Sequence, residues 1–137
     1  MEDRIQATII ALFTAEPLGS VVVQHAADEA RRRGGRLVIL DPRPNDEKPP
    51  AATRAARDAG AALEADGLAV TVRAEARGQS NGTRAVWLAD ELDAELLVIG
   101  MRRRSPVGKI VLGSGAQDAL LGANCPVLAV KLPDPDA

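Results

Sequence analysis

The sequence predicts a single α/β domain built on a doubly wound, mostly parallel sheet. Short apolar runs alternate with segments of helical spacing, in the order strand, helix, strand, helix, strand, helix, strand, loop, helix, strand. Strands joined by helices favour right-handed crossovers and parallel pairing. The 137 residues, 46% of them apolar, can build one hydrophobic core. We expect residues 1–132 to form the domain and 133–137 to be a disordered tail.

The first half of the chain predicts two strands around one helix. A near-continuous apolar run at 7–13 is typical of a strand covered on both faces, and 37–40 is a second such run. Between them, apolar residues recur at helical spacing from Leu18 to Arg33, and the Gly34-Gly35 pair supplies the stop. The proline-rich polar segment 41–50 predicts a loop.

The next elements continue the alternation. An Ala-rich helix starts at Ala51 and ends at Gly67, and 68–74 alternates as a half-exposed strand near a sheet edge does. Ser80 or Asn81 can cap a helix that ends before Asp93, because both side chains accept hydrogen bonds from a helix's first N–H groups. A short buried strand at 96–99 and a last strand at 126–131 complete the predicted sheet.

The basic segment from Gly100 to Gly115 carries the functional signal, because it links a buried strand to a helix. Ser114 and Gln117 have the spacing of a capping box that opens a helix ending at Gly122. N–H groups at a helix start are unpaired and favour anions, and Gly113 lacks a Cβ that would keep a phosphate away. Ser114 can donate its hydroxyl to the anion or cap the helix. Positive charge comes from Arg102, Arg103, Arg104 and Lys109, which either contact phosphate or form a solvated loop.

Composition and motif searches exclude several functions. Phe13 and Trp87 are the only aromatic residues and the net charge is −2, which argues against a nucleic-acid partner. A Walker A loop fails because Arg103 and Ile110 replace its Gly and its Ser or Thr. We find no metal-ligand or catalytic motif, so an enzymatic role stays open and is at most slow ATP hydrolysis.

The expected location is the cytoplasm, without a membrane partner. The apolar run at 9–13 is too short for a signal-peptide core with its flanks or for a membrane span. Cys125 is the single cysteine, so an internal disulfide is impossible and the residue is expected to pack as a small core side chain.

The chain resembles the universal stress protein family at several positions. The family motif is Gly, two residues, Gly, nine residues, then Gly followed by Ser or Thr. Gly100 matches its first position, Gly113-Ser114 matches its last pair, and 125–128 looks like the family's closing strand. Two positions depart from the pattern: Arg103 stands at the second Gly, and Thr14 stands where many nucleotide-binding members carry Asp.

The resemblance implies a five-stranded sheet of order 3-2-1-4-5, an adenine nucleotide (ATP or AMP) as ligand, and a homodimer formed through the last strand at 126–131. Magnesium is expected only where it accompanies ATP. The alternative is a dimeric interaction module of the stress response that has lost nucleotide binding. The predicted nucleotide-binding residues are Leu12, Thr14, Asp41, Gly100, Met101, Arg103, Lys109, Gly113, Ser114 and Gly115.

Overall fold

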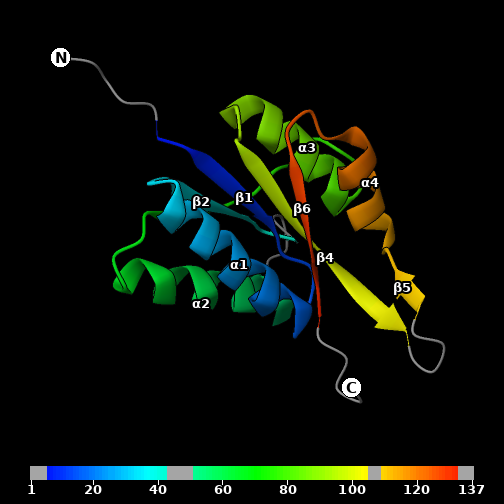
Figure 1. Ribbon diagram of the computed structural model, residues 1–137, viewed down its shortest axis with the longest axis horizontal. Helices are drawn as coiled ribbons and strands as arrows, with labels where there is room; N and C mark the ends of the chain where they lie inside the picture. The colour runs from blue at the N-terminus through cyan, green and yellow to red at the C-terminus, as the bar shows by residue number, and fades with distance from the viewer. Residues whose placement is uncertain (1–5, 43–50, 105–108, 133–137) are drawn as a thin grey trace.

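The computed structural model describes residues 6–42, 51–104 and 109–132, which form a sheet between two layers of helices (Figure 1). Residues 43–50 of the loop predicted at 41–50, and the predicted tail at 133–137, lie outside the described residues. In chain order the elements are β1 Thr8–Leu12, α1 Leu18–Arg32, β2 Arg36–Leu40, α2 Ala51–Ala65, β3 Val70–Arg73, α3 Asn81–Leu92, β4 Leu96–Arg104, β5 Lys109–Val111, α4 Ser114–Gly122 and β6 Val127–Lys131.

Five parallel strands lie in the order β3-β2-β1-β4-β6, which is the predicted order 3-2-1-4-5 when β5 is left out of the count. The register places Leu12 of β1 opposite Leu40 of β2, and Ala11 opposite Val98 of β4. The predicted fold class is therefore confirmed. Among the described strands, β3 and β6 are the edges of this parallel sheet, and each pairs with one neighbour.

The core consists of two apolar clusters, one on each face of the sheet. Because successive side chains of a strand point to opposite faces, Ile9 and Ala11 of β1 enter one cluster, and Ile10 and Leu12 enter the other. Helices α1 and α2 cover the first cluster, and α3 and α4 cover the second (Figure 1). Strands covered on both faces explain the unbroken apolar runs of the sequence.

Helix ends follow the predicted capping chemistry in two cases. Ser80 caps α3: its side chain accepts a hydrogen bond from the Thr83 N–H, and the Thr83 hydroxyl accepts one from the Ser80 N–H. Helix α1 ends where Gly34 adopts a φ of 63°, and the Gly35 N–H returns to the Ala30 carbonyl at 2.8 Å.

The segment after Gly100 differs from the prediction. The strand predicted at 96–99 continues to Arg104, and its end pairs with β5 as an antiparallel hairpin that projects from the body (Figure 1). The prediction of a loop was wrong because a run of arginines carries no clear strand signal, while the antiparallel ladder satisfies its backbone. The residues at 105–108, between the two strands, are outside the described part of the chain.

Candidate functional site

The carboxyl ends of the parallel strands meet at one edge of the sheet, and this edge gathers several predicted site residues. Leu12 ends β1, Asp41 follows β2, and Gly100 lies on β4 two residues beyond Val98, the partner of Ala11 in β1. In doubly wound sheets, ligands bind at this edge where the strand order reverses, here between β1 and β4. Thr14 is half-buried and follows β1, whereas the Leu12 side chain is only 1% exposed and belongs to the core.

Asp41 holds the end of β2 to α2. Its carboxylate is 4% exposed and accepts a hydrogen bond from the Thr53 hydroxyl at 2.9 Å, and Arg57 approaches the other carboxylate oxygen to 3.4 Å. Thr53 itself is buried in the first turn of α2. This contact could not be predicted from the sequence, because the partners lie twelve and sixteen residues away across a polar segment.

Gly100 lies under the start of α1. A Cβ at this position would approach the side chain of Leu18 to 2.7 Å, and Leu18 is buried in the core. The glycine thus allows α1 to pack closely on β4. This packing explains glycine at position 100 without any ligand. Next along the strand, Met101 is half-buried and pairs with Lys131 of β6.

The start of α4 offers open space. Gly113 is the N-cap, with φ −61° and ψ 159°, and a Cβ there would meet no atom within 4 Å. The capping-box prediction was wrong, because Ser114 is the first residue of the helix and not its cap. The Gln117 N–H bonds to the Gly113 carbonyl, so the first helical N–H groups, at 114–116, are those that have no partner within the helix.

Gly115 serves a helix contact. Its carbonyl oxygen lies 1.8 Å from the position that a Cβ on Gly82 would occupy, so α3 and α4 touch backbone to backbone. A Cβ on Gly115 itself would meet only the Gly82 nitrogen, at 3.6 Å. The contact is strengthened where the Ser80 hydroxyl donates to the Asp118 carboxylate at 2.7 Å. This arrangement fixes the direction in which the α4 amides point.

Basic residues of the motif lie on the hairpin beside this helix start. Arg103 is opposite Ile110, and Arg104 is opposite Lys109, in the antiparallel ladder. Arg103 therefore lies in an extended strand, a backbone conformation that any residue with a Cβ adopts without strain. The backbone does not require the glycine that the family motif has at this position. Arg102 is exposed at the base of the hairpin.

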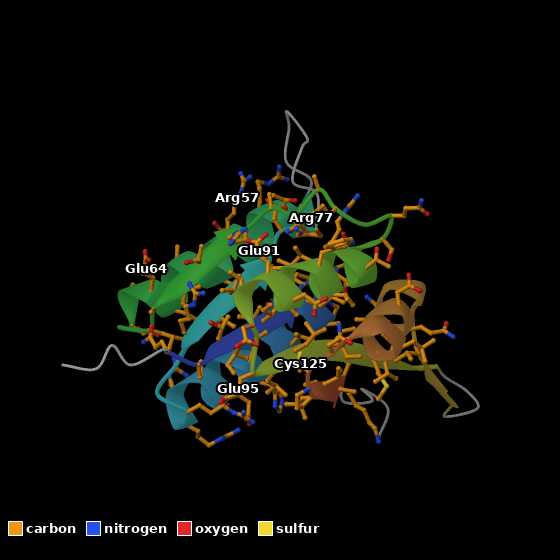
Figure 2. All side chains as sticks on the ribbon, turned by 90° about the horizontal axis from the view of Figure 1, so that it is seen from above. Arg57, Glu64, Arg77, Glu91, Glu95 and Cys125 are labelled. Atoms are coloured by element: carbon orange, nitrogen blue, oxygen red, sulfur yellow. The ribbon has the colours of Figure 1, made fainter. Side chains whose placement is uncertain are left out.

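An ion-pair network that the sequence analysis missed closes the β3 side of the same edge. Arg77 contacts Glu75 at 2.7 Å and also contacts Glu91 of α3, and Figure 2 shows Arg77 and Glu91 side by side. Arg73 contacts the same Glu91 at 2.7 Å. The Arg77 side chain and its backbone N–H both donate to Glu75, and they lower the pKa of this 6% exposed carboxyl to about 2. In the sequence, the opposite charges of Glu75 and Arg77, two residues apart, were the one feature that could have indicated this network.

Neither a metal site nor a reactive cysteine thiol is indicated by the described residues. Within the described ranges, no group of three or more His, Cys, Asp or Glu side chains could hold a metal ion. Cys125 is half-buried against the second apolar cluster, and burial together with the charge of Asp90 raises the pKa of its thiol. A raised pKa disfavours the reactive thiolate. Among the described residues, no helix is long and apolar enough to cross a membrane.

Comparison with known proteins gives one consistent relationship. The model of the universal stress protein family matches residues 8–131. A curated protein described as "Universal stress protein", from Mycolicibacterium smegmatis, is 39% identical over 128 residues, which cover 90% of this chain and 96% of the relative.

Solved structures share the fold. A universal stress protein from Archaeoglobus fulgidus gives a TM-score of 0.72 at 30% identity, over 92% of this chain and 98% of its own. The structure of the universal stress protein from Archaeoglobus fulgidus in complex with dAMP gives 0.65 at 25% identity, over 92% and 98%. A universal stress protein in complex with cAMP gives 0.67 at 25% identity, over 93% and 98%.

Proposed function

Because the chain belongs to the universal stress protein family, we propose that it binds an adenine nucleotide, AMP or ATP, at the carboxyl edge of its sheet. The observation that carries the proposal is the start of α4, where Gly113 faces open space and the first helical N–H groups have no partner within the helix. Such a helix start favours phosphate through its unpaired donors and its dipole. Two similar structures hold dAMP and cAMP, which supports the adenine class.

In the proposed complex, phosphates contact the backbone at Gly113, Ser114 and Gly115. Arg103 and Lys109 of the hairpin supply positive charge to the phosphates. Gly100 and Met101 of β4 line the proposed nucleotide site next to the hairpin. The base lies toward Leu12, Thr14 and Asp41, at the ends of β1 and β2. Magnesium enters only with the triphosphate of ATP, as a ligand of the nucleotide.

Calorimetric titration of AMP, ATP with and without magnesium, and GMP tests this proposal. Gly113→Val is the informative variant, because its Cβ meets no protein atom and its φ of −61° suits any residue. We expect Gly113→Val to weaken AMP binding by about tenfold or more by crowding the phosphate, with Gly113→Ala intermediate. Unchanged affinity in Gly113→Val would contradict the proposed phosphate position.

A second candidate function, a protein-interaction module that binds no nucleotide, is favoured by the contacts that the Asp41 carboxylate already makes. Its carboxylate already bonds Thr53 and Arg57, and Thr14 departs from the family pattern, in which many nucleotide-binding members carry Asp. Absence of any heat or melting-temperature shift with millimolar AMP and ATP, together with no adenine nucleotide released from the purified protein on denaturation, would support this second function and reject the first.

We also propose a homodimer through β6. This strand bonds β4 on one side, and no described strand pairs with its other side. Four of its five residues, Val127 to Val130, are apolar, and an exposed apolar edge strand is a template for pairing with a second chain. The proposed interface is an isologous strand-to-strand contact.

A further inference from the structure

A groove runs between α3 and α4 on the side of these helices away from the sheet. Four of its lining residues, Thr83, Val86, Trp87 and Asp90, follow one another on α3 at positions i, i+3, i+4 and i+7, so they form one stripe along the helix. Asp118 and Gly122, four residues apart on α4, form the facing wall. The cavity measures about 310 Å³.

The groove is apolar where a solvated helix surface is normally polar. Trp87 is 48% exposed, and Leu121, on the same side of α4 as Asp118, is 77% exposed. Large apolar side chains that gather at an open groove mark interaction surfaces. The Trp87 ring is already held in place, because the Arg77 guanidinium lies over it at 5.1 Å from the ring centre.

Two carboxylates give the groove negative charge without a cationic partner. Asp90 accepts hydrogen bonds from the Asn124 amide at 3.1 and 3.3 Å, and Asp118 accepts one from the Ser80 hydroxyl. Within the part of the chain that the structure describes, neither aspartate forms an ion pair, and neighbouring Arg77 pairs with Glu75 and Glu91. A guanidinium or ammonium group is the chemical complement of this pair of oxygens.

We propose that this groove docks a basic peptide segment of another protein, with one apolar anchor beside an arginine or lysine. The apolar side chain would pack on Val86, Trp87 and Leu121, while the cation would reach Asp90 or Asp118. A segment fits better than a small molecule, because the stripe from Thr83 to Asp90 is about 10 Å long and a further exposed apolar side chain, Leu121, stands outside the cavity lining, three residues after Asp118 on α4. This proposal is independent of nucleotide binding.

Trp87 provides the readout, because it is the only tryptophan of the chain. Its emission is followed while the protein is titrated with a short amphipathic peptide that carries leucines and arginines along one face. We expect saturable binding with a shift in emission, weakened by salt. The same peptide with glutamates in place of the arginines should bind about tenfold or more weakly, since like charges would then face each other.

The matched variants change charge and preserve shape. In the double variant Asp90→Asn, Asp118→Asn, the amide oxygens still accept from Asn124 and Ser80, so the local hydrogen bonds survive. We expect this variant to bind the arginine peptide about tenfold or more weakly. Asp58→Asn, which removes an exposed charge from α2 on the opposite face of the sheet, should bind as the wild type does.

Four results would overturn the proposal. The first is an arginine peptide that leaves Trp87 emission unchanged or binds no better than its glutamate analogue. The second is full affinity in the double variant. The third is competition by free arginine methyl ester at the same concentration as the peptide, which would make the occupant a small cation. The fourth is a wild-type dimer that Leu121→Ser dissociates, which would make the occupant a second copy of the chain.

Discussion

The two glycines at the α3–α4 crossing should respond in opposite ways to the same substitution. Gly82→Ala places a methyl group 1.8 Å from the Gly115 carbonyl oxygen, and because that atom belongs to the backbone, the helices must separate. We expect a loss of about 1–3 kcal/mol in the free energy of unfolding. Denaturant titration measures it. A Gly82→Ala protein of unchanged stability would show that the helices can slide apart freely.

Gly115→Ala is the matched control across the same contact. Its methyl group would meet only the Gly82 nitrogen at 3.6 Å, an ordinary contact distance. Because alanine favours the helical backbone more than glycine does, we expect stability to stay unchanged or rise by up to about 1 kcal/mol. A destabilised Gly115→Ala would mean that the contact is tighter than these distances indicate.

Residue roles were the part of the site that sequence reasoning predicted least well. The spacing of Gly100, Gly113 and Gly115 was visible, but the structure gives the three glycines different surroundings: Leu18 over the first, open space at the second, and α3 against the third. A motif records which residue is present and not what lies against it. The attachment of Asp41 to α2 likewise depends on tertiary contacts that periodicity does not encode.

At the scale of elements, the ion pairs of Glu75 hold the segment between β3 and α3 in place, and we expect their contribution to the free energy of unfolding to fall in acid. The pKa of Glu75 is lowered from 4.5 to about 2, so the folded state binds fewer protons than the unfolded state in this interval. The contribution of Glu75 to stability is therefore complete above pH 4.5 and is lost as the pH falls toward 2. Unfolding measured across this range should show the decline.

Glu75→Gln isolates that contribution. The amide cannot form the ion pair with Arg77, so we expect a loss of about 1–3 kcal/mol at neutral pH and a stability that falls less steeply between pH 4.5 and 2. Glu64→Gln, at an exposed position of α2, is the control. If wild type and Glu75→Gln lose stability in parallel on acidification, the network does not hold this connection.

Elements with a clear period were predicted well, and the hairpin was not. The helices at 18–33 and 81–92 carry apolar stripes and clear ends, and the unbroken apolar runs of β1 and β2 indicated covered strands. The part of β4 beyond Gly100 has no such pattern: Met101 pairs with β6, and Arg102 to Arg104 pair with β5 through the backbone. Pairing between strands of low apolar content is nearly invisible in a single sequence.

At the scale of the whole molecule, the open side of β6 predicts how a dimer can be broken without unfolding the chain. The Leu97 N–H bonds the Pro126 carbonyl, and the Leu132 N–H bonds the Met101 carbonyl. With the two-residue repeat of a strand, the even-numbered residues face β4 and the N–H groups of Val127, Ala129 and Lys131 face outward. Ala129→Pro therefore removes an outward donor and leaves the β4 ladder intact.

We expect light scattering to find a dimer for the wild-type protein at micromolar concentration and a monomer for Ala129→Pro. Circular dichroism should show that the variant keeps its helices and strands. A monomeric wild type, or a folded Ala129→Pro that remains dimeric, would contradict pairing through this edge.

Strand β4 pairs with three neighbours: its first residues pair with β1, its middle pairs with β6, and its last three pair with β5. One continuous strand thus runs from the buried centre of the sheet to the projecting hairpin. Met101, the residue of β4 just before the hairpin, pairs with Lys131 of β6, so we expect a tilt of the hairpin to strain this pair first. A spectroscopic label on the hairpin would consequently report strain at the chain's outer strand, some distance from where it is attached.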